Sequence, residues 1–90
     1  MNTTEKIALE FSRVLRANLT ADEMRKVIKR NEADTDMDVC HSHDFCDANY
    51  YMDIAFQNVT GSRVDMSKDG DLTMVNNAWN IAKQSKFSVA

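Results

Sequence analysis

The chain has 90 residues, a formal net charge of −3 and a hydrophobic content of 43%. This length predicts one folded domain over residues 1–90 and excludes a deep cleft between two domains. The sequence has no proline and two glycines, which favours helices joined by short turns over a β-rich fold. No apolar run approaches the roughly 18 residues that cross a bilayer, and the first residues do not resemble a signal peptide. We therefore expect an all-α cytoplasmic protein.

Charge is unevenly distributed along the chain. Residues 1–31 contain seven Lys or Arg and four Asp or Glu, whereas residues 32–58 contain seven acids and no Lys or Arg. Such an acidic block either faces the basic first third of the same chain or is available to a basic partner.

The first two predicted helices form a helical hairpin. Apolar residues recur at spacings of three and four over residues 4–17, and Thr3 is the expected N-cap. Thr20 and Glu23 match a T-x-x-E capping box, which predicts a second helix over residues 21–31.

The second predicted helix exposes four basic residues: Arg25, Lys26, Lys29 and Arg30. A helix–turn–helix with a basic second helix is typical of DNA-binding domains. The acidity of the whole chain opposes phosphate binding, however, and this face has no aromatic residue to stack on a base. We therefore expect a solvated face, with nucleic-acid binding as an alternative.

A third helix is predicted to begin near Asp38 or Ser42 and to end near Thr60. One of its faces is apolar and the other is partly apolar, which indicates neighbours on more than one side. We therefore expect a compact four-helix bundle with this third helix at its centre.

The last predicted helix covers residues 72–85, with Asp71 as its N-cap. Trp79 is the largest hydrophobic side chain of this helix and is expected to anchor the core. Phe87, just beyond the helix, is expected to fold back onto the core.

Six potential metal ligands surround the predicted start of the third helix: Cys40, His41, His43, Asp44, Cys46 and Asp47. A helix places Cys40, His43 and Asp47 on one face, where they would hold zinc or a similar ion. No C-x-x-C pair completes a closed site. The structural alternative is that His43 pairs with Asp47 and that Asp44 favours the positive helix N-terminus.

The same cluster contains the residue types of a Cys–His–Asp enzyme. The surrounding acids oppose a lowered pKa of the Cys40 thiol, and a single helix face lacks the separate oxyanion donors of acyl transfer. We therefore expect no enzymatic activity.

Residues 65–76 partly match a calcium-binding loop. Asp65, Asp69 and Gly70 occupy ligand and turn positions of the EF-hand pattern, but Asn76 stands where a bidentate Glu is required. The alternative is a turn at Asp69 and Gly70 that leads into the last helix.

Tyrosines and acids lie together on the third predicted helix, where Tyr50, Tyr51, Asp53 and Asp44 suggest an interaction surface. Tyrosine is enriched among interface anchors, and the acids suit a basic protein partner. The alternative is that neighbouring helices cover these side chains. A homodimer is also compatible with a small acidic bundle.

The segment CHSHDFCDANYYMDIAF, with LTADEMRKVIKRNEAD before it and WNIAK after it, resembles a group of short uncharacterised proteins of bacteriophages and bacteria. The resemblance covers residues 19–83 and is most specific at the central motif. It implies a small helical protein of phage or prophage origin, which would act in the host cytoplasm. It implies no reaction and no ligand.

Overall fold

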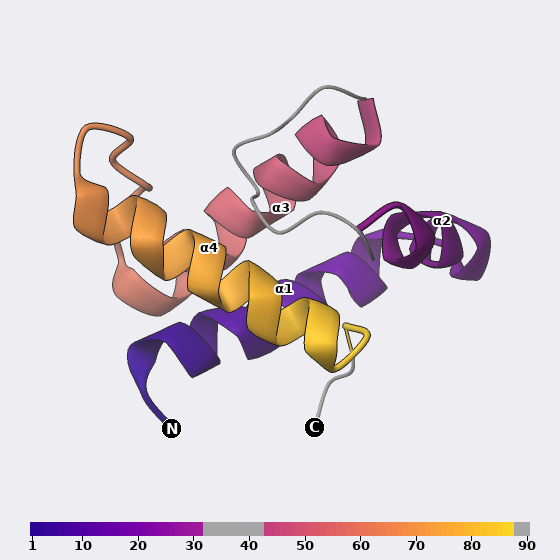
Figure 1. Cartoon of the computed structure of the whole chain (residues 1–90), viewed down its shortest axis with the longest axis horizontal. Coiled ribbons are helices and arrows are strands. Elements are labelled where there is room, and N and C mark those ends of the chain that lie inside the picture. Colours follow the sequence, from indigo (N-terminus) through magenta and orange to yellow (C-terminus); the bar gives the residue numbers. More distant parts are fainter. Residues whose placement is uncertain (32–42, 88–90) are drawn as a thin grey trace.

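A computed structural model describes residues 1–31 and 43–87, with side chains described over residues 1–29 and 49–87. It contains four helices: α1 (Thr3–Asn18), α2 (Ala21–Asn31), α3 (His43–Thr60) and α4 (Asp69–Gln84) (Figure 1). The all-α prediction is confirmed, and the described residues form no strand. The Cα radius of gyration of 11.8 Å is close to the value of about 12 Å expected for a compact domain of this length.

Capping boxes fix the starts of the first two helices. The predicted box of α2 is confirmed: Glu23 N–H donates to Thr20 Oγ1 at 3.2 Å, and Thr20 N–H donates to Glu23 Oε1 at 3.0 Å. The predicted N-cap of α1 is wrong by one residue, because the Asn2 side chain accepts from Glu5 N–H at 2.8 Å. Each reciprocal pair satisfies backbone donors that a helix start leaves free.

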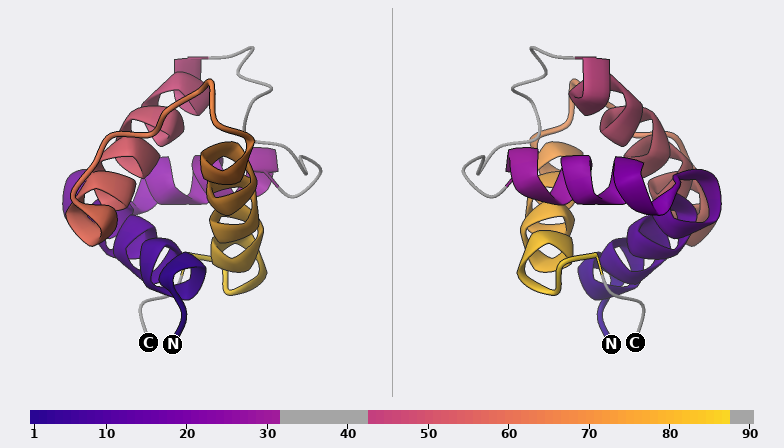
Figure 2. Two further views of the ribbon diagram at one scale, coloured as in Figure 1. Left: turned by 90° about the vertical axis from the view of Figure 1, so that its left-hand side faces the viewer. Right: turned by 90° about the vertical axis from the view of Figure 1, so that its right-hand side faces the viewer.

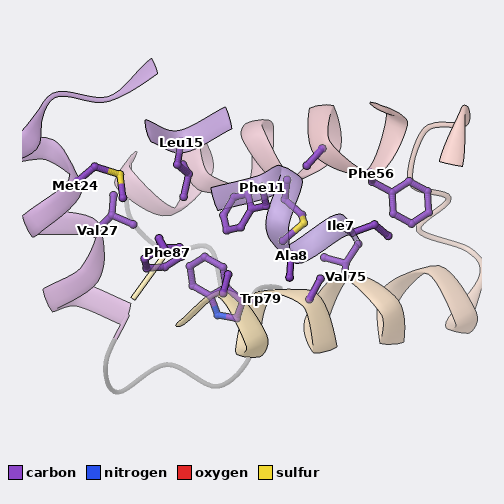
Figure 3. Close-up of a cluster of buried hydrophobic side chains, with 14 residues drawn as sticks. Ile7, Ala8, Phe11, Leu15, Met24, Val27, Phe56, Val75, Trp79 and Phe87 are labelled. Carbon is purple, nitrogen blue, oxygen red and sulfur yellow. The ribbon is translucent and has the colours of Figure 1, made fainter. Parts of the chain in front are cut away.

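The core gathers around α1, which packs against both α3 and α4. Its residues Ile7, Ala8, Phe11 and Leu15 form a continuous buried stripe that α3 and α4 cover from two sides (Figures 1 and 3). The predicted compact four-helix arrangement is confirmed, and within it α1 contacts both α3 and α4. Among the described residues, α3 and α4 make few contacts with each other. In Figure 2 these two helices lie apart and α2 runs across them.

Three aromatic rings fill the core between α1 and the C-terminal end of α4. The rings of Phe11, Trp79 and Phe87 lie pairwise 5.7 to 5.9 Å apart in tilted or edge arrangements (Figure 3). Trp79 is fully buried, which confirms it as a packing anchor. Its Nε1–H has no hydrogen-bond partner among the described residues.

The expected return of Phe87 to the core is confirmed and has a backbone cause. Phe87 N–H donates to Ala82 O at 2.7 Å and Lys86 N–H donates to Lys83 O at 2.9 Å, a Schellman motif that closes α4. Arg16 Nε on α1 donates to Phe87 O at 2.5 Å and so attaches this end to the first helix.

The start of α4 differs from the prediction. The helix begins at Asp69 with Lys68 as an N-cap that makes no side-chain hydrogen bond. Asp71, the predicted N-cap, lies inside the first turn, where Oδ2 accepts from Asp65 N–H at 2.9 Å. Gly70 is helical rather than part of a turn.

Candidate functional site

The exposed side of α3 carries the tyrosine that the sequence singled out. The side chain of Tyr50 is 64% exposed, whereas Met52, Ala55 and Phe56 on the opposite side are buried in the core. The Tyr50 ring meets the Tyr51 ring edge-on, with centroids 5.4 Å apart. This contact restricts the Tyr50 ring while leaving most of it open to solvent, which suits an interface anchor.

Tyr51 differs from its neighbour, because it is partly buried and packs against the core cluster. The Tyr51 side chain is therefore less accessible than that of Tyr50. Tyr51 therefore supports Tyr50 from the side of the core, and Tyr50 presents the accessible aromatic surface.

Asp53 lies one turn after Tyr50 and is engaged within the chain. Its Oδ1 accepts from Val64 N–H at 3.3 Å, and its Oδ2 lies 3.6 Å from the Arg63 guanidinium. Arg63 is largely exposed, so this ion pair contributes little to stability. Asp53 thus holds the segment after α3 against the helix.

A groove opens where α3 and α4 separate, beside Asp53. Its volume is about 420 Å³, and it is lined by residues of α3, the connecting segment and α4: Asn49, Met52, Asp53, Arg63, Val64, Met66, Leu72 and Val75. The lining is mainly apolar with a few polar groups at the edge, which is the usual composition of a binding site. Asn49 and Asp53 place this groove next to Tyr50 on the same helix.

Sequence reasoning did not find the groove. Met66 and Leu72 carry no chemical motif, and the separation of α3 from α4 depends on tertiary packing. The one available signal was the length of the irregular segment after α3, which contains an apolar Met66 among polar neighbours.

The predicted zinc ligands cannot be placed. Cys40 and the side chains of His43, Asp44 and Asp47 lie outside the described residues. Within the part of the chain that the structure describes, no group of three His, Cys, Asp or Glu residues is arranged to hold a metal ion.

The calcium-loop geometry does not form. Asp65 Oδ1 accepts from both Ser67 N–H and Ser67 Oγ, and α4 starts already at Asp69. Positions that an EF-hand would use as loop ligands are therefore helical. The hydrogen bonds from Ser67, the side-chain one foremost, lower the pKa of the Asp65 carboxyl.

The basic residues of α2 point to solvent where they are described. Arg25, Lys26 and Lys29 are exposed, and the side chain of Arg30 lies outside the described residues. Arg25 pairs with Asp22 one turn earlier on the same helix.

No protein-family model matches the chain, and no match was found among curated proteins or solved structures. No described helix is long and apolar enough to cross a membrane.

Proposed function

We propose that this chain is a small non-enzymatic binding or accessory protein that contacts a protein partner through the exposed side of α3. The observation that carries the proposal is the exposed Tyr50 ring, held edge-on by Tyr51 beside an apolar groove. Tyrosine anchors of this kind contribute strongly to protein interfaces because a rigid ring gives a large contact area at low entropic cost.

The acidic composition of this part of the sequence favours a basic partner. Asp53 borders the groove, and residues 32–58 contain seven acids without a Lys or Arg. Opposite charge raises the rate of encounter and disfavours acidic competitors. The resemblance to phage and bacterial proteins adds the proposal that the partner is a protein of the host cytoplasm.

The proposal is tested by affinity capture with the native protein and two variants. Tyr50→Ala removes the proposed anchor from an exposed position, and Lys29→Ala is the matched control on the exposed face of α2. We expect Tyr50→Ala to reduce recovery of a specific bacterial protein at least about fivefold, the effect of losing a residue worth more than 1 kcal/mol. Lys29→Ala should leave recovery unchanged. Equal recovery with all three proteins contradicts the proposal.

A metal-binding domain built on Cys40, His43 and Asp47 remains the second candidate, and a helix–turn–helix nucleic-acid binder the third. Native mass spectrometry with and without a chelator tests the former, and salt-dependent gel shifts test the latter.

A further inference from the structure

The turn at residues 85–87, just after α4, contains strained backbone. Lys86 and Phe87 have φ of 54° and 55°, and they are the non-glycine residues with positive φ in the part of the chain that the structure describes. A left-handed conformation is unfavourable for a residue with a Cβ, because the Cβ lies too close to the following carbonyl oxygen. Such strain persists only where surrounding contacts hold it, and it is concentrated at clamps and switch regions of proteins.

Contacts with α1 and α4 hold this turn closed. Phe87 is 1% exposed, and its ring centroid lies 5.9 Å from that of Phe11 and 5.8 Å from that of Trp79 (Figure 3). The exposed Arg16 side chain reaches the turn from α1, where Nε donates to Phe87 O at 2.5 Å and Nη2 donates to Lys86 O at 3.3 Å. Arg16 therefore attaches both strained residues to the first helix.

The turn can leave the core without unfolding a helix. Because α4 ends at Gln84, Phe87 lies beyond the last helical residue, whereas its two ring partners belong to α1 and α4. Opening gives up one buried ring and a few hydrogen bonds, while it relieves the strain and returns conformational freedom to three residues. Proteins open in such cooperative units at free energies below that of global unfolding.

The buried tryptophan adds a second reason for local opening. Trp79 Nε1–H has no hydrogen-bond partner among the described residues. A buried donor without an acceptor costs free energy that contact with water recovers. Withdrawal of the Phe87 ring uncovers part of the Trp79 ring, so water can approach the indole in the open form.

We propose that the turn at residues 85–87 is a conformational device that opens while the four helices remain folded, with Arg16 as the contact that holds it closed. In the open form Phe87 leaves the core, both strained residues relax, and the rings of Phe11 and Trp79 become accessible at the end of α4. Opening thus gives the folded chain a second apolar surface, which the closed form hides. This surface belongs to α1 and α4 and is separate from the exposed side of α3.

Native-state hydrogen exchange, measured by NMR on the full chain, tests the proposal. Trp79 is the single tryptophan of the sequence, so its Nε1–H gives one assignable signal. We expect Phe87 N–H and Trp79 Nε1–H to have protection factors at least about tenfold lower than that of Ala55 N–H, a buried position inside α3, because local opening costs less than global unfolding. Low concentrations of urea should accelerate exchange at Ala55 but hardly at the other two, since urea sensitivity scales with the surface that opening exposes.

Variants separate the turn from the rest of the bundle. Arg16→Met keeps an unbranched side chain without donors and should lower the protection factor of Phe87 N–H about fivefold, because the closed form loses its charge-assisted hydrogen bonds. Arg13→Met is the matched control on α1, since Arg13 pairs with Glu10 of the same helix and keeps this contact when the turn opens. It should leave the Phe87 value unchanged. Lys86→Gly should raise this value about two- to fivefold by relieving strain in the closed form.

Two results would overturn the proposal. If Phe87 N–H and Trp79 Nε1–H are as protected as Ala55 N–H and respond to urea in parallel with it, the turn opens only when the whole chain unfolds. If Arg16→Met leaves the protection factor of Phe87 N–H unchanged, or if Arg13→Met lowers it equally, Arg16 does not hold the turn closed. The measurement on the native chain requires no substitution, so a variant that fails to fold still leaves the proposal tested.

Discussion

The Asp53 carboxylate on α3 accepts a hydrogen bond from the backbone N–H of Val64 at 3.3 Å. The contact gives Asp53 a structural role besides its place at the edge of the groove. It holds the segment after α3 in position, and this segment carries Arg63 and Met66 to the groove. Charge and acceptor function must therefore be separated when Asp53 is tested.

Asp53→Asn and Asp53→Ala are expected to differ. The amide oxygen of Asn can still accept from Val64 N–H, whereas Ala leaves this partly buried donor without its acceptor, at a cost of about 1 to 3 kcal/mol. Hydrogen exchange at the Val64 amide should accelerate more in Asp53→Ala than in Asp53→Asn. Equal acceleration would show that the hydrogen bond does not hold the segment.

Two substitutions of Trp79 separate the contribution of ring packing to stability from that of its unpaired Nε1–H donor. Trp79→Ala removes a fully buried ring and is expected to lower the free energy of unfolding by about 3 to 5 kcal/mol. Trp79→Phe keeps an aromatic ring and removes an Nε1–H that has no partner among the described residues, so its cost should be about 1 to 2 kcal/mol. Urea unfolding measures both, with Ile81→Ala as the exposed control. Equal losses would contradict this view of the core.

Lys86 occupies a left-handed conformation, with φ of 54°, at the position of the Schellman motif where glycine is usual. Lys86→Gly should raise the free energy of unfolding by about 0.5 to 1 kcal/mol, since relief of backbone strain exceeds the entropic cost of glycine. Its carbonyl, which accepts from Arg16, is retained. Lys83→Gly, within α4, should instead destabilise by about 1 kcal/mol. Chemical unfolding measures both free energies. If both variants are stabilised, or both are destabilised, the assignment of Lys86 to the left-handed position of the Schellman motif is contradicted.

Stability is expected to decrease in acid because hydrogen bonds lower the pKa of Glu10, Glu23 and Asp65. The Arg13 guanidinium is the main cause for Glu10, and Thr20 N–H is the main cause for Glu23. A lowered pKa in the folded state stabilises above the unfolded value of about 4 and is lost as pH falls through the folded value. Thermal melts from neutral pH into acid should show a smaller decrease for Glu23→Gln than for the native chain. If the melting temperature falls equally in both proteins on acidification, the α2 capping box does not contribute to the loss of stability.

The sequence predicts local features of the fold better than its tertiary arrangement. The start of α2 is correct because Thr20 and Glu23 signal it within four residues. The start of α4 is missed because Asp71 accepts from Asp65 N–H instead of capping the helix. The partly apolar outer side of α3 suggests burial, whereas Tyr50 on that side remains 64% exposed.

In the candidate site too, local features are predicted from the sequence and tertiary ones are not. The exposure of Tyr50 agrees with an expectation drawn from residue type. The groove depends on how far α3 and α4 diverge around α1, which no local pattern encodes. The contact between Asp53 and Val64 likewise arises only when the segment after α3 folds back on the helix.

Photo-crosslinking from single positions tests most directly whether a protein partner contacts the exposed side of α3. A photoreactive benzoylphenylalanine is placed at position 50 or 66, with positions 29 and 81 as exposed controls on α2 and the other part of α4. The account predicts one covalent adduct with the same bacterial protein from positions 50 and 66, and none from positions 29 and 81. Adducts of equal yield from all four positions, or adducts from 29 and 81 alone, would contradict an interaction surface on α3.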